Sequence, residues 1–148
     1  MCMKCDGYSD EEIERHLDLV IRVHGYLIQQ VTAEPAPWTY TIGLRESFDH
    51  PELLCVDIEG GTQTTLIKEL GDEVARERRI DATMLRELDL ALLEVDESHL
   101  HRDDLVGGWE ERYQRSALRG DFLQVAPGPS WFCECHAGLL RRLDRPAA

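Results

Sequence analysis

The sequence lacks the long apolar runs that mark membrane proteins. No stretch approaches the roughly 20 apolar residues that a membrane-spanning helix needs. The opening segment Met1–Gly7 also has no apolar core of the kind that a secretory signal carries. We therefore expect a cytoplasmic protein that does not have a membrane among its partners. In that compartment thiols stay reduced, which favours metal or redox chemistry over disulfides.

Basic residues are also scarce. The chain holds 16 Lys and Arg against 29 Asp and Glu, which gives a formal net charge of −13. A surface of this sign repels phosphate backbones, so nucleic-acid binding would need a local basic patch. The two densest basic segments, 76–79 and 141–145, resemble helix ends more than a binding groove. The sequence therefore argues against a nucleic-acid partner.

Common catalytic motifs are missing as well. The sequence contains no phosphate-binding loop, dinucleotide fingerprint, zincin helix or serine-nucleophile elbow. It also contains no internal repeat, low-complexity segment or linker, so we expect residues 1–148 to form a single domain. The sequence therefore argues against the commonest enzyme classes, and any functional residues belong to less familiar patterns.

The first structural elements have clear start and stop signals. Ser9 and Glu12 form the capping-box pattern, apolar residues follow at helical spacing, and a glycine ends the pattern, which predicts a helix over 9–24. Segments 26–32 and 38–44 are rich in β-branched and aromatic residues and lie on either side of a proline-rich link. They are predicted to be neighbouring antiparallel strands.

Shorter patterns predict the remaining elements. Strands are expected at 53–58, 91–95 and 122–125, and helices are expected from a cap at Thr62, within 80–88 and around 109–113. Helices at the front and middle, with strands clustered between them, favour an α+β fold. We expect a mostly antiparallel sheet packed with two or three helices.

Four of the five cysteines lie near the two ends of the chain. Cys2 and Cys5 form a C-x-x-C pair, and Cys133, Cys135 and His136 form a second cluster. Thiolate and imidazole are the ligands that suit tetrahedral zinc. We predict that one structural zinc ion brings the termini together. Its ligands are Cys2, Cys5, Cys133 and Cys135, or the same set with His136 in place of one thiolate.

Other interpretations of these thiols stay open. A site with three protein ligands and one water would be an open, catalytic zinc site. A redox pair normally lies at a helix N-terminus, but the predicted helix begins at Ser9, after Cys5 and too late to activate it. The thiols could also be reduced and unliganded. Cys55 lies in an apolar run and is predicted to be a small buried side chain.

A second group of versatile side chains lies around the turn between two predicted strands. Tyr40, Thr41, Arg45, His50 and Glu52 supply hydroxyls, a guanidinium, an imidazole and a carboxylate. Strand ends are where a rigid sheet presents a ligand pocket, and a guanidinium can hold a carboxylate or phosphate in fork geometry. The alternative is a structural role, with a bend at the intervening glycine, a His-Pro turn and an aromatic core. We favour the structural alternative.

Several segments resemble a known family. Tyr40–Leu44, followed by His50–Leu53, resembles the signature of an uncharacterised, mainly bacterial family, domain of unknown function 4262. The start Cys2–Gly7 and the step His24–Tyr26 are also similar to that family, in which tryptophan is the commoner aromatic residue of the step. The resemblance covers roughly the first two-thirds of the chain. Phe132–His136 departs from the tryptophan-rich ending of many relatives, which implies that a zinc site belongs to a subgroup.

The family resemblance implies no activity, so the functional expectation comes from the residues. We expect a zinc-stabilised binding or adaptor module whose partner is a small molecule or a protein. The alternative is an enzyme that acts on a small anionic substrate through Arg45, His50 and Glu52, or through an open zinc site.

Overall fold

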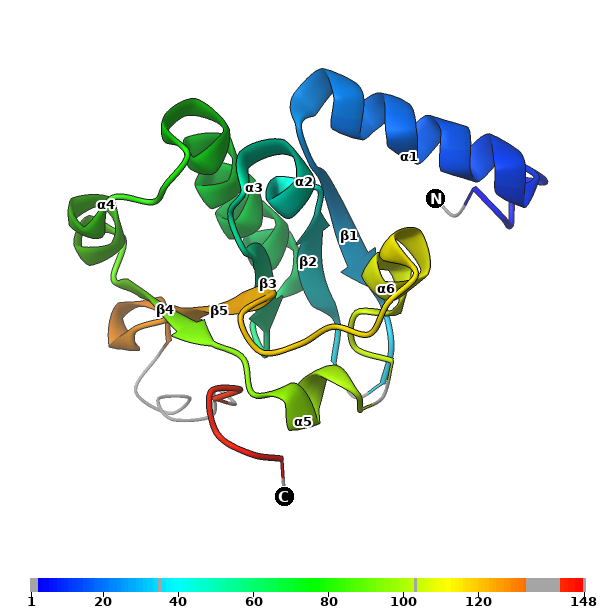
Figure 1. The fold of residues 1–148 in the computed structure, drawn as a ribbon. Helices are drawn as coiled ribbons and strands as arrows, with labels where there is room; N and C mark the ends of the chain where they lie inside the picture. The colour runs from blue at the N-terminus through cyan, green and yellow to red at the C-terminus, as the bar shows by residue number, and fades with distance from the viewer. Residues whose placement is uncertain (1–2, 35, 103, 133–141, 148) are drawn as a thin grey trace.

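The computed structural model describes residues 3–34, 36–102, 104–132 and 142–147. They form one five-stranded sheet in the order β1-β2-β3-β5-β4, with helices on both faces (Figure 1). The strands are β1 (Leu27–Val31), β2 (Trp38–Ile42), β3 (Glu52–Val56), β4 (Leu90–Glu94) and β5 (Phe122–Pro127). The helices are α1 (Asp10–His24), α2 (Leu44–Phe48), α3 (Gly60–Glu77), α4 (Ala82–Glu87), α5 (Glu97–Leu100), α6 (Gly107–Tyr113) and the 3-10 helix η1 (Pro129–Trp131).

The sheet is mixed but mostly antiparallel. β3 and β5 pair in parallel, whereas β1–β2, β2–β3 and β4–β5 are antiparallel. The expected α+β fold is therefore confirmed, although the described residues form six α-helices and not two or three. Within the same residues, no helix combines the length and the apolarity needed to cross a bilayer.

Alternating side chains of the sheet enter two apolar clusters, one on each face. Tyr40 and Ile42 of β2 join a cluster that includes Trp109 of α6 and residues of α1 and α5. On the opposite face, Leu53 and Cys55 of β3 pack with residues of α2, α3 and α4. The period-2 alternation of a strand thus places the sheet between two helical layers.

The first helix has the predicted ends. The hydroxyl of Ser9 accepts a hydrogen bond from the amide of Glu12 at 3.2 Å, and the Glu12 carboxylate accepts from the Ser9 amide at 2.8 Å. Gly25 ends the helix with φ of 86°, a left-handed conformation that glycine adopts at low cost. This capping box and the antiparallel β1–β2 pair that follows are confirmed.

Two local features differ from the prediction. α3 begins at Gly60, because the carboxylate of Glu59 accepts from the amides of Gly61 and Thr62 at 2.8 and 2.9 Å. The expected cap at Thr62 is therefore wrong, since the ionised carboxylate of Glu59, three residues earlier, is the stronger acceptor. α2 was not expected, because its N-terminus is capped by the carboxylate of Glu52 in β3, which lies outside the helix.

The described chain ends lie beside different elements. The N-terminal residues lie at the start of α1, whereas 142–147 lie near α5 (Figure 1). The amide of Leu143 donates to Gln124 at 2.7 Å, and its carbonyl accepts from Asp96 at 2.7 Å. The predicted joining of the termini concerns Cys2, Cys133, Cys135 and His136, all of which lie outside the described residues.

Candidate functional site

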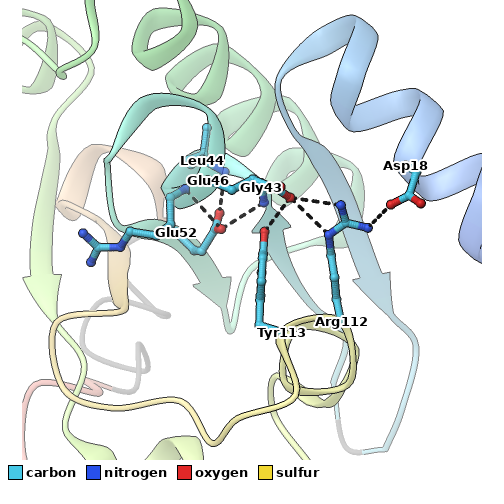
Figure 2. A network of polar contacts seen from close by, with 8 residues as sticks. Asp18, Gly43, Leu44, Glu46, Glu52, Arg112 and Tyr113 are labelled. Carbon is cyan, nitrogen blue, oxygen red and sulfur yellow. Dashed lines mark hydrogen bonds and ion pairs between the residues drawn. The ribbon is translucent and has the colours of Figure 1, made fainter.

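Glu52 lies fully buried at the start of β3 and is surrounded by hydrogen-bond donors. Its Oε2 atom accepts from the Thr41 hydroxyl at 2.6 Å and from the Leu44 amide at 3.1 Å. Its Oε1 atom accepts from the amides of Gly43 at 2.9 Å and Arg45 at 3.4 Å. We call this group, Thr41 and 43–45 around Glu52, the Glu52 hub; Figure 2 shows Glu52 with Gly43 and Leu44. It caps the N-terminus of α2 with a carboxylate from the next strand.

Burial and hydrogen bonding act on the Glu52 carboxyl in opposite directions. Burial raises the pKa of Glu52 above its ordinary value, while the Thr41 hydroxyl and the three amides work to lower it. Both carboxylate oxygens are occupied by these donors. The carboxylate therefore organises the β2–α2 connection and presents no oxygen to solvent.

Gly43 allows α2 to pack tightly on the end of α1. Its φ is 117°, and a Cβ atom there would lie 2.9 Å from the carbonyl oxygen of Gly25 and 3.0 Å from Cα of Tyr26. Both neighbours are backbone atoms that cannot move aside. The two segments that resemble the family signature and its His-Gly-aromatic step are therefore in direct backbone contact.

The side chains of Thr41 and Tyr40 form hydrogen bonds within the fold. The Thr41 hydroxyl donates to Glu52 and accepts from the Leu53 amide at 2.9 Å. The Tyr40 side chain is buried, and its hydroxyl accepts from the Gly108 amide at 3.1 Å. Burial raises the pKa of Tyr40 to about 12. These side chains join β2 to β3 and to the start of α6.

Arg45 and His50 are partly exposed but are also hydrogen-bonded. Arg45 donates to the Gly120 carbonyl at 3.0 Å and lies 3.6 Å from the Asp49 carboxylate. His50 Nδ1 donates to its neighbouring carbonyl, that of Pro51, at 2.7 Å. Burial lowers the pKa of His50, and the Arg45 charge acts in the same direction. Every member of the predicted ligand pocket thus has a structural partner, and its contact with a ligand stays a prediction.

An open groove lies on the outer side of α2. It is lined by Asp18 and 21–25 at the end of α1, by 46–48 of α2, by Ala75 of α3 and by Arg112 of α6. We call it the α1–α2 groove.

Arg112 forms one edge of the groove and links three helices (Figure 2). Its guanidinium pairs with Asp18 of α1 at 2.7 Å and with Glu46 of α2 at 3.0 Å. The Tyr113 hydroxyl donates to the same Glu46 carboxylate at 2.9 Å. Because the Arg112 side chain is 18% exposed, these pairs are shielded more than ordinary surface pairs.

Three other polar side chains line the groove and have no partner among the described residues. Within the described ranges, neither Arg22, His24 nor Ser47 forms a side-chain hydrogen bond or ion pair. They supply a guanidinium, an imidazole and a hydroxyl, all of which can donate hydrogen bonds. The sequence prediction missed this set, although Ser47 lies between the two halves of the signature and His24 begins the His-Gly step.

The remaining predicted site residues concern metal binding. Cys5 lies in an exposed turn in which the Met3 carbonyl accepts from the amides of Asp6 and Tyr8, both at 3.1 Å. Its four predicted co-ligands lie outside the described ranges. In the part of the chain that the structure describes, no three His, Cys, Asp or Glu side chains are grouped to hold a metal. Cys55 is buried, which raises its pKa to about 12 and makes it a poor ligand or nucleophile.

Comparison with known proteins identifies the family and nothing more specific. Neither the curated proteins nor the solved structures include a match to this chain. A family model described as Domain of unknown function (DUF4262) matches residues 20–126, a range that holds both the Glu52 hub and nearly all of the α1–α2 groove. The chain therefore belongs to the DUF4262 family.

Proposed function

We propose that this protein is a non-catalytic binding module and that the α1–α2 groove is its binding surface. The observation that carries the proposal is that one open groove is lined by three donors, Arg22, His24 and Ser47, without a side-chain partner in the described part of the chain. A few polar donors on one concave surface can fix the orientation of a ligand, as they do in small-molecule sites.

The geometry gives less support to the enzymatic alternative. A general acid or base has to come within hydrogen-bond reach of its substrate. Both oxygens of Glu52 accept from protein donors, and the residue is fully buried. Arg45 and His50 donate to backbone carbonyls. Catalysis through Glu52 would require its donors in the β2–α2 connection to be displaced, so we favour binding over catalysis.

The test of the binding proposal uses two matched tryptophan variants of α1. Val23 lies in the groove and is 64% exposed, and Leu19 lies outside it on the same helix and is 54% exposed. We would titrate the ¹⁵N-labelled protein with a library of neutral, cationic and anionic compounds and follow the amide resonances. A ligand should shift the groove amides in the native protein and in Leu19→Trp, and Val23→Trp should abolish the shift. If no compound shifts the groove amides, the proposal is rejected.

We also propose that a zinc ion held by Cys2, Cys5, Cys133 and Cys135, or with His136 replacing one thiolate, stabilises the module. The Cys5 turn supports this, because Gly7 adopts φ of 88° two residues after the cysteine and permits the tight backbone that a metal-binding loop needs.

Metal analysis of the full chain, purified without chelator, tests the zinc proposal. The expected result is one zinc per chain, lost on Cys5→Ser or Cys133→Ser and retained on Cys55→Ser. Metal-free protein with four freely reactive thiols would overturn it.

A further inference from the structure

The unpartnered groups of the α1–α2 groove define a ligand chemistry. We propose that the groove binds a small anion, a molecule that carries a carboxylate or phosphate group, held by Arg22, His24 and Ser47. This inference rests on the proposed binding function and adds the chemical class of the ligand.

The two arginines of the groove differ in the charge that they leave available. Arg112 already faces two carboxylates, those of Asp18 and Glu46. Arg22 is exposed and has no carboxylate partner in the described part of the chain. Its guanidinium therefore keeps both its charge and the donor fork that matches a carboxylate or phosphate. The positive charge available to a ligand in the groove is that of Arg22, with further donors from His24 and Ser47.

The other walls of the groove suit a ligand with a small apolar body. Ile21, Phe48 and Ala75 contribute apolar surface beside the polar donors. The Phe48 ring lies so close to Gly25 that a Cβ atom there would approach it to 2.3 Å. Glycine at this position therefore lets the ring pack against the end of α1. The lining is therefore mixed, with these apolar side chains beside a larger polar part, which suits a small ligand with one charged group.

A purely structural role would also explain a basic end of α1. Arg22 and His24 lie in the last helical turn, where positive side chains interact favourably with the helix dipole. That role would affect the stability of α1 but would not produce a saturable response to an anion. The decisive measurement is therefore anion binding with stability measured separately.

The experiment is an NMR titration of the full chain at constant ionic strength with inorganic phosphate, succinate and neutral succinamide. We expect saturable shifts of groove amides with at least one anion, with a Kd on the order of 1 mM, and none with succinamide. A response to phosphate alone or to succinate alone identifies which group is the natural one. Arg22→Gln should raise the Kd roughly tenfold, because a charge-assisted pair is lost.

Arg79→Gln is the matched control. Arg79 is exposed, lies outside the groove and has no side-chain partner among the described residues. It should leave the Kd unchanged and thereby exclude a general charge effect. The inference is overturned if neither anion shifts the groove amides, or if Arg22→Gln and Arg79→Gln weaken binding equally. If succinamide or other neutral compounds bind in the groove and anions do not, the anion inference fails while the proposed binding function stands.

Discussion

The two sides of α2 use their polar groups in different ways. On the inner side, the Glu52 hub satisfies a buried carboxylate with four donors, three of them backbone amides. On the outer side, Ser47 lines a groove with Arg22 and His24, and none of the three has a side-chain partner within the described ranges. A buried donor without a partner is costly, whereas an exposed one is hydrated. The comparison teaches that the buried polar residues of the signature stabilise the fold, whereas Ser47, between its two halves, lines a surface groove.

Removing the Glu52 carboxylate should have the largest effect on the free energy of unfolding. Glu52→Ala leaves the Thr41 hydroxyl and the amides at the start of α2 buried without an acceptor. We expect a loss of about 3–5 kcal/mol in the free energy of unfolding, measured by urea denaturation. Glu87→Ala, an exposed glutamate in α4, is the control and should change the stability by less than about 0.5 kcal/mol. Equal effects of the two variants would refute the structural role of the hub.

The contact between α2 and the end of α1 should be the next most sensitive feature. Gly43→Ala adds a Cβ atom 2.9 Å from the Gly25 carbonyl oxygen at a φ of 117°. We expect a loss of about 3 kcal/mol from backbone strain and collision. Gly120→Ala shares a positive φ of 92° but meets no atom within 4 Å, so it should cost only about 1 kcal/mol. A Gly43 variant as mild as the Gly120 variant would show that the contact is not tight.

Asp121, beside the hub, should give the stability a measurable acid dependence. Burial raises the pKa of Asp121, but the hydrogen bonds from Arg115 and from the Leu118 amide outweigh it and lower the pKa below 3.8. The folded carboxyl thus keeps its charge to lower pH than the unfolded one, and its contribution is lost as the pH falls below about 4.

Asp121→Asn should therefore cost about 1.5–2 kcal/mol at pH 7. The difference from the native protein should shrink as the pH falls through this range, when both are followed by urea denaturation. A difference that stays constant with pH would contradict the charged interaction with Arg115.

A substitution at the edge of the groove should reduce the stability less than a substitution in the Glu52 hub. Arg112→Gln removes the ion pairs to Asp18 and Glu46, and we expect a loss of about 1 kcal/mol. Because Arg112 holds α1 against α2, amide hydrogen exchange in the second half of α1 should become faster. Arg119→Gln, which breaks an exposed pair with Glu94, should leave exchange in α1 unchanged. Unchanged exchange in both variants would show that apolar packing alone holds the helix.

The smallest effect on stability is expected inside the groove. Arg22→Gln and Ser47→Ala remove groups that have no partner within the described ranges, so each should change the free energy of unfolding by less than about 0.5 kcal/mol. Urea denaturation of both variants checks this. A loss as large as that of Glu52→Ala would mean that the groove belongs to the folded framework and is not a free surface.

Much of the fold could be predicted from the sequence because its signals are local. The capping box at Ser9, the glycine stop after α1 and the alternation in β2 each depend on residues within a few positions of one another. α2 could not be found in this way, since its capping carboxylate comes from Glu52 in the next strand. The interpretation of Thr41 and Tyr40 as structural residues matches their buried hydrogen bonds.

The groove depends on contacts between distant segments. Arg112 and Asp18 are 94 positions apart in the sequence, and Arg112 and Glu46 are 66 apart. Neither helical nor strand periodicity relates residues so far apart, so the sequence pattern does not predict these contacts. The His-Gly step and the signature did mark two of the walls, but nothing in the sequence indicated that they face each other across one surface.

The sequence by itself determined the α+β class, the ends of α1 and the membership of a family, because these depend on short-range backbone and side-chain preferences. The tertiary structure decided which polar residues in and around the signature form hydrogen bonds inside the fold and which line the surface groove. The physical reason is burial: strand pairing places Glu52 beneath α2, where every donor needs an acceptor, and leaves Arg22, His24 and Ser47 in water.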